Sequence, residues 1–351
     1  MKGLVLHGNE DVRYDNFADP KIEDEQDVIV KIERTAICGS DLHLWNAPTM
    51  DIDGFLLGHE FGGVIEDAGK AVGRFKKGDR VLVSCTVGCG NCAHCHDHQY
   101  GACEKTTGGI PYTNVFGSPM RQGGQAEAAL VPFADTNLFA VPEHMDYEQC
   151  LFLTDILPTG YMGADLAEVG PGDVVVVFGC GPVGTFAQRS AQIRGAAIVI
   201  AVDLNEGRLA RATNTGCIGV NPSKVDLKER VLELTHGRGA DCAIEAIGIP
   251  ELIGDAIDVV RYNGRVSVIG VMPQGDVPVP WMMGVMAKSL TMRSGLVEPQ
   301  NYFNTLMPLI ESGRIDPTEI ITHRMPLAEG AAGYEMFAAR GADVLKVVMT
   351  P

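Results

Sequence analysis

The chain has 351 residues, of which 46% are hydrophobic and 21% are charged, as is ordinary for a soluble globular protein. These values exclude a disordered chain, a coiled coil and a small disulfide scaffold, and the length predicts about two domains. Acidic residues outnumber basic ones by 45 to 28, which gives a net charge of −17. Such a surface repels nucleic-acid phosphates and anionic lipid, so we expect neither a nucleic-acid nor a membrane partner.

The N-terminal stretch lacks an apolar core long enough for a signal peptide. No apolar run in the sequence approaches the ~20 residues of a membrane helix. A cytoplasmic location is therefore expected. In a reducing compartment, the ten cysteines indicate metal binding or catalysis rather than disulfide bonds.

The N-terminal part of the chain is predicted to be β-rich. Short apolar runs at 28–32, 63–66, 80–84 and 126–131 are separated by Gly, Pro and Asp. Such closely spaced turn signals favour a barrel or a folded sheet over βαβ units.

From about residue 161 the pattern changes to alternating strands and helices. Strand-like runs lie at 174–178, 198–202, 241–244, 265–271 and 289–292, and amphipathic helices are predicted at 184–194, 206–214 and 227–235. This alternation is typical of a doubly wound parallel sheet. After Glu298 it stops.

A glycine-rich motif follows the first of these strands. The segment Gly179-Cys180-Gly181-Pro182-Val183-Gly184 has the form G-x-G-x-x-G at a junction of strand and helix. Gly179 permits the tight turn, Gly181 lets the backbone approach a pyrophosphate, and Gly184 lets helix and strand pack closely. Pro182 suits the first turn of a helix, whose free amides attract phosphate. The motif predicts a dinucleotide site.

Asp203 is expected to select the dinucleotide. It ends the second strand, nineteen residues after Gly184, where an acidic side chain binds the adenosine ribose. A phosphate about 4 Å from this carboxylate is repelled by up to ~4 kcal/mol at an effective dielectric of ~20. NAD is therefore expected rather than NADP. Arg208 is interpreted as a ribose or adenine contact, with a solvated charge on the helix face as the alternative.

Four cysteines with short spacings predict a structural zinc site. Cys89, Cys92, Cys95 and Cys103 supply the four thiolates that close a tetrahedral shell. A closed shell leaves no open position, so its expected role is to pin a loop. Other ligand sets stay open at this point, because further candidates lie nearby: Cys85, His94, His96 and His98.

The segment Gly58-His59-Glu60, with Gly63, Gly69 and Val72, resembles the zinc signature of the medium-chain alcohol dehydrogenases. The cysteine lobe and the glycine-rich motif occur in that family's order and separation. The resemblance covers essentially the whole chain.

The resemblance implies a catalytic zinc ion in addition to the structural one, hence two zinc ions per chain. Cys38 and His59 match two of its ligands. The third is expected to be Asp155, as in the branch that contains secondary-alcohol dehydrogenases and glutathione-independent formaldehyde dehydrogenases, with Cys150 as a competing candidate. Glu60 matches a glutamate that approaches the metal, with a structural salt bridge as the alternative.

The resemblance also implies roles around the metal. Ser40 and His43 have the spacing of the family's proton relay, and a histidine relay predicts an oxidation rate that rises between roughly pH 6 and 8. Asp41 is expected to orient His59. Thr159 matches a residue that packs beside the nicotinamide, and Lys346 matches a basic pyrophosphate contact.

The implied architecture combines α/β and β classes. A GroES-like β-rich catalytic domain, 1–157 with 298–351, carries an inserted doubly wound Rossmann domain, 158–297, and the active site is expected between them. Family members form homodimers or homotetramers through the coenzyme domain. The apolar run 277–286, with Trp281, Met282, Met283 and Met286, is expected either in that interface or in the core of its own domain.

The expected function is a zinc-dependent oxidoreductase that transfers hydride between NAD and a secondary or small primary alcohol, giving a ketone or aldehyde. The enzymatic alternative is a formaldehyde or aldehyde dehydrogenase or dismutase. The alternative of another class is a nucleotide-binding protein without catalytic activity.

Overall fold

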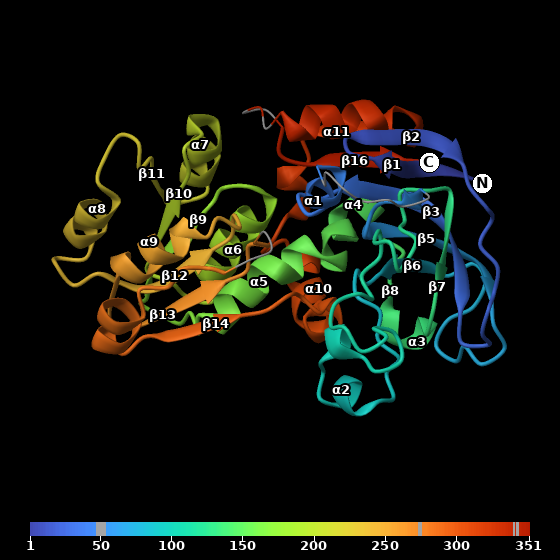
Figure 1. Ribbon diagram of the computed structural model, residues 1–351, viewed down its shortest axis with the longest axis horizontal. Helices are drawn as coiled ribbons and strands as arrows, with labels where there is room; N and C mark the ends of the chain where they lie inside the picture. Colours follow the sequence, from blue (N-terminus) through green and yellow to red (C-terminus); the bar gives the residue numbers. More distant parts are fainter. Residues whose placement is uncertain (47–53, 273–275, 340, 342–343) are drawn as a thin grey trace. The chain divides into compact units, whose positions relative to one another are not determined.

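The computed structural model describes residues 1–46, 54–272, 276–339, 341 and 344–351 (Figure 1). The chain divides into two compact units, Met1–Pro158 with Val297–Pro351, and Thr159–Leu296. The boundaries expected from the sequence lie within one residue of these divisions.

The described residues of the first unit form two sheets. A three-stranded sheet has the order β2-β1-β4, and a larger one has the order β15-β16-β3-β5-β6-β8, with β7 also paired to β3. Because β16 pairs with β3, the C-terminal segment belongs to the same unit as the N-terminal one. The strands are β1 (Lys2–Gly8), β2 (Asp11–Asn16), β3 (Val28–Ile37), β4 (Phe55–Leu56), β5 (Glu60–Ala68), β6 (Arg80–Val83), β7 (Ala128–Val131), β8 (Leu138–Ala140), β15 (His323–Pro326) and β16 (Val347–Thr350).

Alternation along β3 places its apolar side chains in the core of this unit. Val28, Val30 and Ile32 are buried, whereas Lys31 between them is exposed. A strand directs successive side chains to opposite faces, so this pattern buries one face. Short helices connect the strands of the unit: α1 (Asp41–Trp45), α2 (Ala93–His96), α3 (Ala134–Asn137), α4 (Tyr147–Cys150), α10 (Phe303–Glu311) and α11 (Gly330–Ala338).

The second unit is a six-stranded, wholly parallel sheet in the order β11-β10-β9-β12-β13-β14. This is the order of a doubly wound nucleotide-binding fold, in which the chain leaves the centre first to one side and then to the other. The α/β class expected for this part is therefore confirmed. The strands are β9 (Val174–Phe178), β10 (Ile198–Val202), β11 (Ile218–Val220), β12 (Ala240–Glu245), β13 (Val260–Val268) and β14 (Thr291–Ser294).

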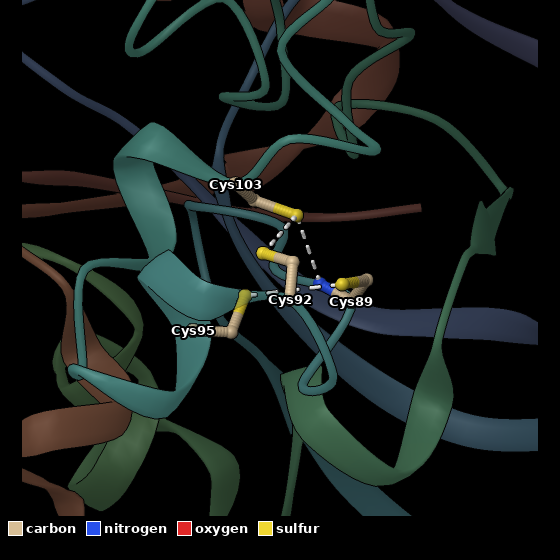
Figure 2. A group of neighbouring side chains, drawn as sticks. All are labelled: Cys89, Cys92, Cys95 and Cys103. Carbon is tan, nitrogen blue, oxygen red and sulfur yellow. Dashed lines mark hydrogen bonds between the residues drawn. The ribbon is translucent and has the colours of Figure 1, made fainter.

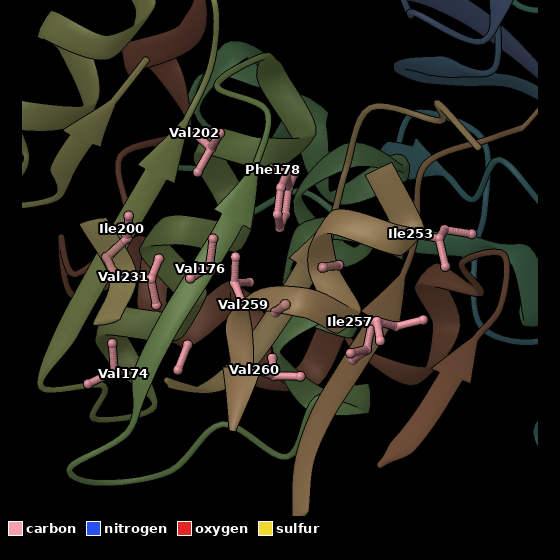
Figure 3. Packing of buried hydrophobic residues seen from close by; sticks show 14 of the residues in the cluster. Val174, Val176, Phe178, Ile200, Val202, Val231, Ile253, Ile257, Val259 and Val260 are labelled. Atoms are coloured by element: carbon pink, nitrogen blue, oxygen red, sulfur yellow. The ribbon is translucent and has the colours of Figure 1, made fainter. Parts of the chain in front are cut away.

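Strand β9 is apolar throughout because it lies in the middle of this sheet. All five of its residues are buried, as expected for a parallel strand covered on both faces. Figure 3 shows its side chains beside those of β10 and α9 in one core. The helices of the unit are α6 (Pro182–Ile193), α7 (Glu206–Asn214), α8 (Leu227–Leu234) and α9 (Glu251–Val259), with α5 (Ile156–Leu166) at the boundary between the units.

The strand predicted at 265–271 is displaced in the structure. Strand β13 begins earlier, at the buried Val260, but the next three residues, 261–263, are partly or fully exposed and two of them are polar, so they give no apolar signal. It ends at Val268, because the next amides, of Ile269 and Gly270, bond to the carbonyl of Glu245. In the described part of the chain, none of the helices combines the length and apolar character needed to cross a membrane.

Candidate functional site

Three donor atoms from distant parts of the first unit meet at one buried point. Asp155 Oδ2 lies 3.5 Å from Cys38 Sγ and 3.2 Å from His59 Nε2. Cys38 follows β3, His59 precedes β5, and Asp155 follows a 3₁₀ turn, Leu151–Thr154. These ligand atoms lie within 4.8 Å of one another, which suits a tetrahedral ion with bonds of about 2.0–2.3 Å. Cys150 lies elsewhere, with its thiol on the carbonyls of Asp146 and Tyr147.

The charge of this group favours a bound cation. Burial opposes protonation of His59, but the charges of Asp41 and Cys38 and the hydrogen bond with Asp155 raise its pKa well above the usual value. A site that draws a proton onto a buried imidazole is strongly negative. A divalent metal ion would replace that proton, so a thiolate, an imidazole and a carboxylate fit zinc and leave a fourth position open.

Asp41 holds the imidazole from the side opposite to the donor group. Its Oδ1 lies 3.2 Å from His59 Nδ1, and its Oδ2 accepts the Cys38 amide. Gln125 donates to the same Oδ2, and the Tyr334 hydroxyl donates to Gln125. Partners of this kind fix the tautomer of a metal-binding histidine. Gln125 and Tyr334 were missed in the sequence, because isolated polar residues in apolar segments carry no motif.

Ser40 lies beside the donor group. Its hydroxyl is 3.3 Å from Cys38 Sγ and 3.2 Å from His59 Nε2. His43 is exposed on α1, the helix that follows Ser40. The residue that precedes this short helix therefore places its hydroxyl at the site, and the helix itself carries an imidazole at the surface. The proton relay assigned to them stays a prediction.

Glu60 forms a fully buried ion pair with Lys346, whose ammonium group also lies 5.5 Å from the centre of the Phe152 ring. Burial raises the pKa of Glu60 to about 7, although the charge of Lys346 acts in the opposite direction. A structural salt bridge was the alternative expected for Glu60, and the structure contains one, but its partner, Lys346, was not predicted. The pyrophosphate contact expected for Lys346 and the metal contact expected for Glu60 stay predictions.

The other metal-binding group consists of four sulfur atoms (Figure 2). Cys92 Sγ lies 3.9 Å from Cys103 Sγ, and Cys89 Sγ lies 4.0 Å from Cys95 Sγ. Burial raises the pKa of Cys103, but hydrogen bonds from Thr106 and the Cys89 amide outweigh it and lower the pKa to about 6. This all-sulfur group fits a structural zinc ion.

The alternative ligands for this lobe are not part of the four-sulfur group. The thiol of Cys85 contacts the carboxylate of Asp155 instead, and the ring of His94 forms a hydrogen bond with the side chain of Gln99. Neither His96 nor His98 belongs to this group.

The glycine-rich segment forms the turn expected between β9 and α6. Gly179 has a φ of +101°, and a Cβ on Gly184 would lie 2.1 Å from the Gly179 carbonyl oxygen. Helix α6 begins at Pro182, followed by Val183, so its first amides are free of helical bonds. This turn fits a dinucleotide pyrophosphate.

Asp203 is tied to the same turn. Its carboxylate accepts the amides of Cys180, at 2.8 Å, and Asn205, at 2.9 Å. A Cβ on Gly181 would lie 3.9 Å from the Arg208 guanidinium, so Arg208 is close to the turn. Thr159 lies on α5, in the same unit. Their contacts with a cofactor stay predictions.

The apolar run at 277–286 is largely at the surface. Trp281, Met282, Met283 and Met286 are between 55% and 79% exposed, so the interpretation of these four residues as core is wrong. The neighbouring Gly284 and Val285 are buried and anchor the segment. An interface role for the exposed residues stays a prediction.

Comparisons with known proteins agree with this geometry. Residues 24–143 match the alcohol dehydrogenase GroES-like domain, and residues 182–312 match the zinc-binding dehydrogenase domain. The chain is 38% identical over 351 residues to a protein of Mycobacterium tuberculosis named probable zinc-binding alcohol dehydrogenase, covering 100% of this chain and 89% of that protein. It is 32% identical to the glutathione-independent formaldehyde dehydrogenase of Pseudomonas aeruginosa, covering 96% and 95%.

A solved structure gives the same result. The alcohol dehydrogenase TADH from Thermus sp. ATN1 superposes with a TM-score of 0.92 at 35% identity, covering 100% of this chain and 99% of that one. The sequence similarity and the fold similarity therefore extend over both units.

Proposed function

The chain belongs to the zinc-type medium-chain alcohol dehydrogenases, and on that premise we propose that it transfers hydride between NAD and a secondary or small primary alcohol. The main support for the proposal is that the ligand atoms of Cys38, His59 and Asp155 lie within 4.8 Å of one another in a buried position. Three protein ligands leave zinc one position for a substrate oxygen. The four-sulfur lobe supports the fold and takes no part in the reaction.

When bound, zinc supplies the Lewis acid that makes an alcohol more acidic, and the nicotinamide supplies the hydride acceptor. The chain contributes position and proton transfer. Ser40 lies where it can accept the alcohol proton, and His43 on the same short segment passes that proton to solvent. Asp41 keeps the His59 ring in the orientation that ligation requires.

The choice of NAD over NADP is supported by Asp203. One oxygen of its carboxylate accepts the backbone amide of Cys180 in the glycine-rich turn, and the other accepts the backbone amide of Asn205. These two bonds fix the carboxylate at the end of β10. A ribose hydroxyl can donate to a carboxylate, whereas a ribose phosphate would be repelled by it. Thr159 and Arg208 are assigned to the nicotinamide and adenosine ends. Lys346 is fully buried against Glu60 and is not among the proposed cofactor contacts.

Formaldehyde or aldehyde oxidation or dismutation is the second candidate. It is favoured by Asp155 in the ligand set and by the similarity to the formaldehyde dehydrogenase of Pseudomonas aeruginosa. A homodimer or homotetramer is proposed, with the exposed Trp281 and methionine side chains on the nucleotide-binding unit at an interface between copies. We place the enzyme in the cytoplasm.

The test measures reduction of NAD and NADP by zinc-loaded protein against primary, secondary, polyol and amino alcohols, with formaldehyde in parallel. The proposal expects activity with NAD and an alcohol, highest for secondary or small primary alcohols. A higher kcat/KM for formaldehyde would favour the second candidate. Absence of all turnover by protein that binds NAD and zinc would favour the non-enzymatic alternative and contradict the proposal.

A further inference from the structure

A second thiol lies against the carboxylate of the candidate catalytic centre. Cys85 is 3% exposed, and its Sγ lies 3.8 Å from Asp155 Oδ1. The other oxygen of the same carboxylate, Oδ2, contacts Cys38 and His59. The two oxygens of Asp155 therefore contact different groups. Oδ2 contacts Cys38 and His59, and Oδ1 contacts Cys85.

Backbone hydrogen bonds fix Cys85 in this place. Its amide donates to the carbonyl of Thr154, the residue directly before Asp155, at 3.0 Å. Its own carbonyl accepts the amide of Phe116, also at 3.0 Å. Because the segment that carries the thiol is bonded to the segment that carries the carboxylate, the contact between the two side chains follows from the local backbone.

The chemistry of the pair depends on how many oxygens Asp155 gives to the metal. A free carboxylate has two oxygens and can bind a cation through one or both. A neutral thiol is a weak hydrogen-bond donor, and thiols are largely protonated at neutral pH. A donor directed at Oδ1 makes that oxygen a poorer ligand, whereas Oδ2 remains directed at the metal position.

We propose that Cys85 is a positioning residue, which donates to Asp155 Oδ1 and so limits Asp155 to one metal–oxygen bond. This proposal rests on the proposed function, since it concerns the same metal centre. Its consequence is that the fourth position of the metal stays available to substrate. Without the thiol, Asp155 binds through both oxygens more readily and competes with the alcohol for that position.

The experiment replaces zinc with ¹¹³Cd and records the cadmium NMR spectrum of the whole protein, because the shift reports the kind and number of donor atoms. The four-sulfur site and the mixed site give separate resonances. Cys85→Ala removes the donor, and Cys85→Ser restores one. Cys150→Ala is the matched control, because it also truncates a buried thiol of the same unit.

The proposal expects the mixed-site resonance of Cys85→Ala to move upfield, toward oxygen-richer coordination, with the four-sulfur resonance unmoved. Cys85→Ser and Cys150→Ala should keep the wild-type position. In the zinc enzyme, kcat/KM for alcohol should fall about tenfold or more in Cys85→Ala, the scale for partners of metal ligands, with recovery in Cys85→Ser.

Two results would overturn the role of Cys85 alone. One is an unmoved mixed-site resonance in Cys85→Ala. The other is an equally large upfield shift in Cys85→Ala and Cys85→Ser, which would make Cys85 a ligand. A wild-type protein that gives only the four-sulfur resonance would instead overturn the catalytic centre itself, and the role of Cys85 with it.

Discussion

The imidazole of His59 and the carboxylate of Asp155 lie 3.2 Å apart, although 96 positions separate them in the chain. Strand β5, which begins directly after His59, packs against the 3₁₀ turn that ends before Asp155. The four-sulfur lobe is different, since Cys89 and Cys103 are only 14 residues apart. The first site therefore depends on the folded sheet, and the second is largely local.

Replacing Lys346 with Met should destabilise the protein by about 3–5 kcal/mol, because it leaves the buried carboxylate of Glu60 without its counter-ion. Urea unfolding measures the change. The double variant Lys346→Met/Glu60→Gln should recover most of the loss. A single variant as stable as the wild type would contradict the importance of this pair.

The stability of Lys346→Met should also depend on pH. The pKa of Glu60 in the folded protein is already raised by burial to about 7, and loss of the lysine charge raises it further. The folded variant thus keeps a proton that the unfolded chain releases above its ordinary pKa. The loss of stability relative to the wild type should therefore be small below about pH 4 and should grow as the pH rises through neutrality. A pH-independent loss of stability would argue against this cause.

Replacing Asp203 with Asn should shift the cofactor preference toward NADP. The side-chain oxygen of Asn can still accept the backbone N–H of Cys180, but the neutral side chain no longer repels a ribose phosphate. The repulsion between the Asp203 carboxylate and a ribose phosphate is up to ~4 kcal/mol. Loss of about a third of it would change the ratio of kcat/KM for NAD to that for NADP about tenfold. Steady-state kinetics with both cofactors measure the ratio. An unchanged ratio would contradict the role of Asp203.

His43→Ala should flatten the pH profile of alcohol oxidation. In the wild type the rate is expected to rise between roughly pH 6 and 8, as a relay through an exposed histidine predicts. The check is kcat across that interval, with hydride transfer in the reverse direction measured beside it. A variant with the wild-type profile would exclude His43 from the relay.

Cys103→Ser should remove the zinc ion of the four-sulfur lobe and lower the melting temperature, because a structural zinc ion contributes directly to folding. Differential scanning calorimetry and limited proteolysis of the lobe measure the effect. Cys150→Ser is the control, since its thiol bonds to carbonyls of its own helix region and lies outside the four-sulfur group. Equal stability of the two variants would argue against a metal in the lobe.

Local patterns in the sequence were enough to predict the elements that carry the nucleotide. The turn at Gly179 and the helix at 206–214 follow from glycine spacing and helical periodicity. The strand predicted at 265–271 was misplaced because the residues after Val260 are mostly polar, and its register depends on pairing with β12 and β14.

The surroundings of the catalytic centre could not be predicted in the same way. The pairing of Glu60 with Lys346 needs β16 beside β3, and the contact of Cys85 with Asp155 needs two backbone bonds between separate segments. Such contacts are produced by tertiary packing, and no characteristic spacing of residues in the sequence indicates them. Even the assignment of Asp155 came from family resemblance rather than from the residues alone.

Cys38, His59 and Asp155 are proposed to hold a metal ion separate from that of the four-sulfur lobe. The most direct test is the zinc content per folded chain of the wild type and of Asp155→Ala, measured by atomic emission after gel filtration. We expect two zinc ions in the wild type and one in the variant, with the ion of the four-sulfur lobe retained. One ion in the wild type, or two in the variant, would contradict the proposal.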